Sequence, residues 1–278
     1  LIGGEDFVVD ASLIKADANR QRGVPGTEGH GSLSPTRAVR EYIDVLDDAA
    51  FGGATQVTPK FISPADPAAR WTAAQGGQAF FAYSTNYLID LDNAVIVDVE
   101  PSTAIRQAEV TATKSMLERT AQTFGLDPVR LAANTAYGSA EMLSWLVHEQ
   151  GIEPHIPVFD KSARRDGTFS REDFHYDHEG DVYVCPEGKT LRTKGTLVND
   201  GARDMARDIA KTDAYVVSRR QRKKVEMLFA HLKRILKLDR LRLRGPTGAR
   251  DEFLLAATAQ NLRKLAKLIP MPQPEPAN

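Results

Sequence analysis

The chain has 278 residues, of which 42% are hydrophobic and 26% charged, and its formal net charge is -1 at pH 7. This length and composition allow one large core, or one core interrupted by a smaller module, and exclude an intrinsically disordered protein. The single cysteine, Cys185, excludes an internal disulfide framework and favours a cytoplasmic protein, and no apolar run approaches the roughly 20 residues of a transmembrane helix.

In the first half of the chain, β-branched and aliphatic residues predict strands, and proline beside small polar residues marks where helices begin. The expected order is a strand pair at residues 7–10 and 11–16, a mobile Gly- and Arg-rich loop at 19–33, a short helix opened by Ser34 and Pro35, a hairpin of residues 79–90 and 95–99, and a helix opened by Pro101 and Ser102 and closed by Gly125. Asp10 then lies in the first strand or at its end. Because the chain begins at Leu1 without a methionine, directly before a strand, we expect an upstream region to be missing.

In the second half of the chain, predicted strands and helices alternate until a polar stretch interrupts the alternation. The expected order is a buried strand ending at Asn134, a helix capped by Ser139, a strand at 154–158, a polar stretch holding a hairpin of residues 174–177 and 181–184, and long final helices. This order predicts an α/β fold in which a mixed sheet is flanked by helices. The polar stretch is interpreted as an insertion, and the proline-rich end of the chain as a frayed tail.

Basic residues are concentrated late in the chain, although the overall charge is nearly balanced. Twelve of them lie between residues 219 and 250: Arg219, Arg220, Arg222, Lys223, Lys224, Lys233, Arg234, Lys237, Arg240, Arg242, Arg244 and Arg250. Such a segment is either an ordinary solvated face or the place where an anionic partner binds. Its density favours contact with phosphates, and binding of this kind weakens steeply with salt.

A helix predicted to begin near Ser218 carries the most informative pattern. At about 100° per residue, Arg222, Glu226 and Lys233 fall within roughly 40° of one another. The apolar residues occupy a different sector and are expected to be buried: Val225, Leu228, Leu232 and Ile235. A glutamate framed by cations is, by itself, most often a solvated ion pair.

Other candidate residues have plainer interpretations. Asp90, Asp92 and Asp98 stand near strand ends, where turn formation and solvated edges are the usual roles of aspartate. A zinc site could be imagined from three scattered donors, but a structural role is favoured because they lack paired ligand spacing: His175, His178 and Cys185.

Several segments, in the same order, resemble the DDE transposases of bacterial insertion sequences. Arg222, Glu226 and Lys233 match the R-x3-E-x6-K pattern around the third catalytic acid in one branch of that family, with Arg219 where a tyrosine is usual. The other matching segments are Val9 to Ala16 around the first aspartate, Asp66 to Trp71 (the D-P-x-A-R-W segment), Ala136 to Glu141 after the second aspartate, and the final helices from Leu241 to Gly245 and from Ala259 to Leu265.

The resemblance implies a ribonuclease-H-like fold with Asp10, Asn134 and Glu226 at the catalytic and metal-binding positions. It also implies two Mg²⁺ or Mn²⁺ ions, double-stranded DNA as partner, and a location at the nucleoid; whether the protein is a homodimer is left open. The residues expected to bind DNA are Arg219, Arg222, Lys223, Lys233, Arg234, Arg242 and Arg244. The predicted domains are residues 1–158 with 202–268 as the catalytic domain, 159–201 as a shortened insertion and 269–278 as a flexible tail.

Two departures from the family pattern bear on activity. Asn134 stands where the family has its second aspartate, which removes one negative charge from a site that attracts dications. The segment after Cys185 lacks the family's cysteine-rich piece, so the insertion is shortened. The first hypothesis is a transposase that cuts and joins DNA with impaired activity. The alternatives are a catalytically inactive DNA-binding remnant and a related nuclease that only hydrolyses DNA.

Overall fold

The computed structural model describes residues 2–28, 35–51, 53, 57–73, 76–159, 167–169, 173–177, 182–192 and 200–268. Two compact units are present: Leu1–Pro128 with Arg220–Asn278, and Val129–Arg219. Strands pair antiparallel in the first unit and both parallel and antiparallel in the second, and helices flank them. The chain therefore has the predicted α/β fold, with a mixed sheet of the ribonuclease-H-like kind. No helix in the described ranges is long and apolar enough to cross a membrane.

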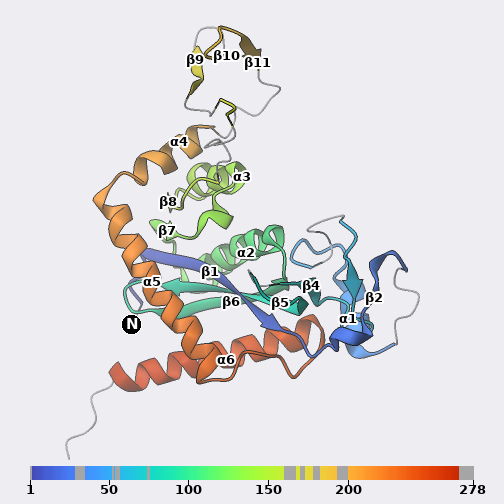
Figure 1. The fold of residues 1–278 in the computed structure, drawn as a ribbon. Helices are drawn as coiled ribbons and strands as arrows, with labels where there is room; N and C mark the ends of the chain where they lie inside the picture. The colour runs from blue at the N-terminus through green and yellow to red at the C-terminus, as the bar shows by residue number, and fades with distance from the viewer. Residues whose placement is uncertain are drawn as a thin grey trace, which may run out of the picture. The chain divides into compact units, whose positions relative to one another are not determined.

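The sheet of the first unit is built around two long strands (Figure 1). β1 (Asp6–Lys15) and β5 (Phe80–Asp90) pair antiparallel, and β5 also pairs antiparallel with β6 (Val95–Thr103) and β4 (Arg70–Thr72). β1 is one continuous strand, so the predicted strand pair at its position was wrong. Its consecutive apolar residues allow this because both faces of the strand are covered: Phe7, Val8 and Val9 are fully buried.

Helices α2 (Arg106–Phe124) and α6 (Gly245–Leu268) cover opposite faces of this sheet. Successive side chains of a strand point to opposite faces. On β5, the Ser84 hydroxyl donates to Glu109 of α2 at 2.6 Å. The preceding side chain, Tyr83, donates instead to Asp66 at 2.6 Å, beside the first residue of α6. Figure 1 shows the two helices on either side of the strands.

Two predicted helix starts were wrong, and both errors concern proline. Pro101 lies inside β6, opposite Thr85, and α2 begins five residues later without a side-chain cap, although Gly125 ends it as predicted, with a φ of 62°. α1 (Arg37–Asp44) begins after Thr36, whose hydroxyl accepts a hydrogen bond from the amide of Val39. Proline fixes φ near -65°, which suits a strand as well as a first helical turn.

The predicted mobile loop at residues 19–33 contains regular structure in its described part. Asn19 caps a 3-10 turn at Arg20–Arg22, and β2 (Val24–Pro25) then pairs with β3 (Phe61–Ile62). Residues 29–34, including the expected cap Ser34, lie outside the described residues.

The second unit contains a parallel strand pair, short helices and a small antiparallel sheet. β7 (Arg130–Ala132) and β8 (Glu153–His155) are parallel, and α3 (Ala140–Ser144) lies between them in sequence, capped by Ser139 as predicted. The predicted hairpin is confirmed as β9 (His175–Asp177) and β10 (Val182–Val184), but a third strand, β11 (Thr190–Arg192), was missed. The remaining helices are α4 (Asp200–Ile209) and α5 (Asp213–Arg234), and α5 continues into the first unit. The predicted frayed tail at 269–278 lies outside the described residues.

The D-P-x-A-R-W segment has a structural role in the first unit. Asp66 is fully buried and bonded to Tyr83, and the Gly245 amide at the start of α6 also donates to it. Gly245 has a φ of 84° and lies against α1, where an added Cβ would lie 2.5 Å from the Glu41 carboxylate and 3.0 Å from Ala38. Trp71 stacks edge-on between Phe61 and Phe81 at 5.3 and 5.0 Å. The segment therefore fastens the start of α6 to the sheet.

Buried Asp66 gives folding a specific pH dependence. Burial raises the pKa of Asp66 from 3.8 to about 6, partly offset by the hydrogen bond from Tyr83. Because the folded state holds the proton more tightly than the unfolded state, stability falls as pH rises from about 4 to about 6, by about 3 kcal/mol. Asp66→Asn removes this titration. Its free energy of unfolding, relative to that of wild type, should increase by about that amount between pH 4 and pH 7. Urea titrations at both pH values measure this difference, and the same difference at pH 4 and pH 7 contradicts the assignment.

Candidate active site and nucleic-acid interface

Asp10 occupies the middle of β1 and faces α5. It is half-buried, and its Oδ1 accepts a hydrogen bond from the Ala11 amide at 3.0 Å. Its Cα partner on β5 is Tyr87, so the two side chains share one face of the antiparallel sheet. The Tyr87 ring lies 5.5 Å from the ring of Phe229, which belongs to α5. The predicted placement of Asp10 in the first strand is confirmed, and α5 packs on its face of the sheet.

Glu226 lies on α5 three residues before Phe229, which places the two side chains on neighbouring turns of one side of the helix. Its carboxylate is exposed and makes no ion pair or hydrogen bond with any other residue that the structure describes. Three predicted apolar residues of this helix are buried: Val225, Leu228 and Leu232. Ile235 is 55% exposed, so its predicted burial was wrong.

The two cations that frame Glu226 differ from an ordinary solvated pair. Arg222 and Lys233 are both half-buried. Burial lowers the pKa of Lys233, and the nearby Asp239 carboxylate acts in the opposite direction. A lysine whose ammonium has lost part of its water gains more from a phosphate than a fully solvated one. α5 begins at Asp213, five residues before the predicted start near Ser218.

Asn134 follows β7 in the second unit and caps the turn that comes after it. Its Oδ1 accepts a hydrogen bond from the Ala136 amide at 2.7 Å, which heads the 3-10 turn of residues Thr135–Tyr137. The predicted buried strand is confirmed, but it ends at Ala132, two residues before Asn134. An aspartate could cap the turn in the same way and still offer its second oxygen, with a full negative charge, to a cation.

The exposed basic residues of the predicted DNA-binding set do not all have the same surroundings. Arg244 forms an ion pair with Asp17 at 2.9 Å and also donates to the Asp17 carbonyl oxygen, so it holds the segment after α5 against the end of β1. Four other members are exposed and make no ion pair with the residues that the structure describes: Arg219, Lys223, Arg234 and Arg242. These four remain the better candidates for phosphate contact.

The sequence analysis missed a further carboxylate near Asp10. Glu109 lies in the first turn of α2 and is half-buried. Burial raises the pKa of Glu109, the hydrogen bond from Ser84 lowers it, and the negative charge of Asp10 raises it again. Only the fold reveals this proximity, because nothing at position 109 distinguishes it from other acids that begin helices.

The donor chemistry of the predicted metal site suits fewer dications than a set of three carboxylates. Asp10 and Glu226 each supply carboxylate oxygens, which Mg²⁺ and Mn²⁺ prefer, whereas Asn134 supplies a neutral amide oxygen that is already bonded to Ala136. Within the described ranges, no three His, Cys, Asp or Glu side chains gather as a metal-binding group. Two carboxylates balance the charge of one dication but not of two.

The structure also shows the surroundings of the aspartates near strand ends and of the zinc candidates. Asp90 is fully buried and accepts hydrogen bonds from the amides of Gly3, Gly4 and Asn93, so it organises a turn as predicted but is not solvated. Asp98 pairs with Arg119 of α2 at 2.9 Å, so its interpretation as a solvated edge was wrong. Of the three zinc candidates, His178 lies outside the described residues, and the Sγ of Cys185 accepts from the Lys189 amide.

Comparison with known proteins provides evidence that does not depend on this geometry. A scan against protein-family models matches residues 3–262 to the family described as Transposase DDE domain. Searches of curated proteins and of solved structures found no match. The matched range includes Asp10, Asn134 and Glu226.

Proposed function

The chain belongs to the transposase DDE domain family, and we propose that it cuts DNA at the ends of an insertion sequence and joins them to target DNA. We place it in the R-x3-E-x6-K branch on Arg222, Glu226 and Lys233. The observation that carries the proposal is the position of α5, which packs through Phe229 on the face of the sheet that bears Asp10. The family match supports a function in transposition in general, and these residues support the specific chemistry that we propose.

Each residue has a part in the proposed reaction. Asp10 and Glu226 would hold Mg²⁺ or Mn²⁺, and the bound ion would supply activation of the attacking hydroxyl and charge neutralisation at the leaving oxygen. Arg222 grips a phosphate with its planar fork, and Lys233 contributes a point charge beside it. Asn134 occupies the position of the second acid and contributes no charge. We therefore infer that the reaction proceeds slowly because metal occupancy is low.

A second candidate function is DNA binding without catalysis. The hydrogen bond between the Asn134 oxygen and the Ala136 amide favours it, because that oxygen must serve both the turn and a metal. Such a protein occupies transposon ends and competes with intact copies. The basic residues of α5 serve both functions equally well.

Product analysis separates these possibilities. Labelled duplexes that carry the element's inverted-repeat ends are incubated with the protein, supercoiled target DNA and Mn²⁺. Joined products of end and target are expected at low yield. Nicked ends without joined products indicate a nuclease instead, and retarded but intact ends indicate the DNA-binding remnant.

Salt dependence tests the cationic part of the interface. Lys223→Ala with Arg234→Ala removes two exposed cations of α5, and the slope of log affinity against log salt should become shallower by about 2. Lys60→Ala, an exposed lysine outside the basic segment, is the matched control and should leave the slope unchanged. Fluorescence anisotropy with a labelled duplex measures all three proteins. Equal slopes for the three remove α5 from the DNA interface.

A further inference from the structure

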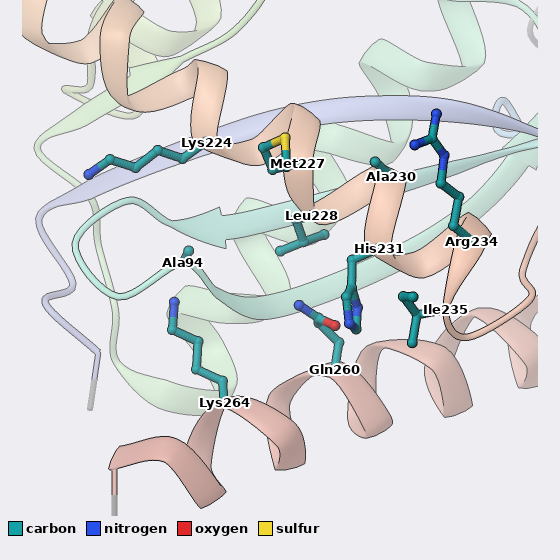
Figure 2. A pocket seen from close by; sticks show the side chains of 10 residues that line it. All are labelled: Ala94, Lys224, Met227, Leu228, Ala230, His231, Arg234, Ile235, Gln260 and Lys264. Atoms are coloured by element: carbon teal, nitrogen blue, oxygen red, sulfur yellow. The ribbon is translucent and has the colours of Figure 1, made fainter.

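A groove lies between α5 and α6 in the first unit and holds about 550 Å³ (Figure 2). We call it the α5–α6 groove. Three cationic side chains line it: Lys224 and Arg234 from α5, and Lys264 from α6. Figure 2 shows Lys224 and Lys264 at the same end of the groove, while His231 and Gln260 project between the two helices. A neighbouring hollow of about 370 Å³ continues along α6 and adds Arg263 and Lys267.

The groove is on a different flank of α5 from the proposed active site. At about 100° per residue, Lys224, Met227 and His231 lie roughly 100° to 160° from the direction of Glu226. The buried stripe of α5 lies between the two flanks. The groove therefore cannot be part of the carboxylate site, and of its cations only Arg234 belongs to the predicted DNA-binding set.

Two buried polar atoms in the groove lack partners. The Nδ1 of His231 and the Oε1 of Gln260 are inaccessible to solvent and make no hydrogen bond with any described residue. Leaving a polar atom buried and unbonded costs about 1–3 kcal/mol, so such atoms commonly mark a place where a ligand or water binds. The other polar atom of each side chain, Nε2 in both, can donate a hydrogen bond to a phosphate oxygen.

The charge in the groove is positive and poorly compensated. Burial lowers the pKa of Lys264, the Asp90 carboxylate raises it, and the charges of Lys267 and Lys224 lower it again. Asp90 compensates the positive charge of Lys264 only in part, because its carboxylate oxygens already accept hydrogen bonds from three backbone amides. No described residue that lines the groove is acidic. An anion placed there gains attraction from several cations at once.

We propose that the α5–α6 groove is a second DNA-binding site, which takes one or two backbone phosphates of a duplex outside the active site. The proposal rests on DNA as the partner in the proposed function. Cations at the rim with hydrogen-bonding groups at the floor suit a phosphate, whose oxygens take both kinds of contact. A contact of this type positions the duplex and does not read its sequence.

The test compares variants on a duplex of arbitrary sequence without metal. Lys224→Gln with Lys264→Gln should weaken binding about tenfold or more at physiological salt and make the salt slope shallower by about 2. Gln260→Met removes a hydrogen-bonding group without removing charge, so affinity should fall severalfold while the slope stays the same. Lys60→Gln is the control, and circular dichroism verifies that each variant is folded.

Each remaining outcome contradicts a defined part of the proposal. If wild type binds the duplex and the Lys224/Lys264 variant binds equally well, the groove is not a DNA site, while the proposed function is unaffected. If wild type binds no duplex, the groove proposal and the proposed function both fail. Unchanged affinity of Gln260→Met would show diffuse charge attraction without a built site. Saturable binding of inorganic phosphate that the double variant loses, with duplex binding intact, assigns the groove to a free phosphate compound.

Chemical protection provides a measurement that needs no variant. The wild-type protein is acetylated with and without the duplex, and the modified lysines are quantified by mass spectrometry. Lys224 and Lys264 should react several times more slowly when the duplex is bound, and Lys60 should react at the same rate. Equal reactivity of Lys224 and Lys264 in both samples contradicts the proposal.

Discussion

Replacing Asn134 by aspartate should increase the Mg²⁺- or Mn²⁺-dependent cleavage of transposon-end DNA by about a hundredfold or more. The change adds a negative charge at the position of the family's second acid, and metal affinity and turnover respond strongly to ligand charge. The fold should tolerate it, because an aspartate oxygen can accept the Ala136 amide hydrogen as the asparagine oxygen does. The measurement is the initial rate of cleavage of a labelled duplex at matched protein concentration.

The comparison needs a variant that adds a charge elsewhere on the same kind of surface. Asn19→Asp changes the same side-chain type at an exposed residue whose Oδ1 also caps a 3-10 turn, by accepting from the Gln21 amide, and it should leave cleavage unchanged. Robust and equal cutting by wild type and Asn134→Asp contradicts the inference that Asn134 limits the reaction. Equal gains by both variants indicate a general effect of charge.

Loss of either remaining carboxylate should abolish the activity that Asn134→Asp gains. In that background, Asp10→Asn or Glu226→Gln should lower the cleavage rate about a thousandfold, which corresponds to ~4 kcal/mol of lost transition-state stabilisation. Both substitutions keep the size of the side chain and remove its charge. Duplex affinity measured without metal should remain within a factor of about two, because neither carboxylate contributes attraction to phosphate.

Two exposed acids provide matched controls for this loss. Asp213 lies at the start of α5, the helix that carries Glu226. Asp92 lies in the turn after β5, the strand that pairs with β1 at Asp10. The controls are Asp213→Asn and Asp92→Asn. Neither should reduce cleavage more than about twofold. Wild-type rates for Asp10→Asn would exclude Asp10 from the reaction, and a parallel loss of duplex affinity would indicate damaged structure.

The elements that position the candidate site could be predicted because their sequence signals are local. β1 and β5 have long apolar runs, Gly125 ends α2, Ser139 caps α3, and Asn134 follows a short buried strand. Each signal depends on neighbours within a few residues, so no knowledge of the tertiary fold was needed. The family resemblance then linked Asp10, Asn134 and Glu226, which local signals alone could not do.

What the sequence could not provide depends on contacts between distant residues. Pro101 was assigned to a helix start because its partner Thr85 on the neighbouring strand was unknown. Glu109 gains its importance only when α2 packs against β5. The α5–α6 groove combines residues more than 30 positions apart. Ile235, expected in the core, lies just beyond the last residue of α5, where it is exposed and lines this groove. Tertiary packing decides each of these cases.

Direct metal binding tests the central claim most simply, without DNA or catalysis. Mn²⁺ is titrated into wild type, Asn134→Asp and the Asn134→Asp/Asp10→Asn double variant by isothermal calorimetry. If Asp10, Glu226 and position 134 hold the same metal, Asn134→Asp should bind Mn²⁺ at least about tenfold more tightly than wild type, and the added Asp10→Asn should remove the gain. Identical Mn²⁺ affinities in all three proteins would contradict the account.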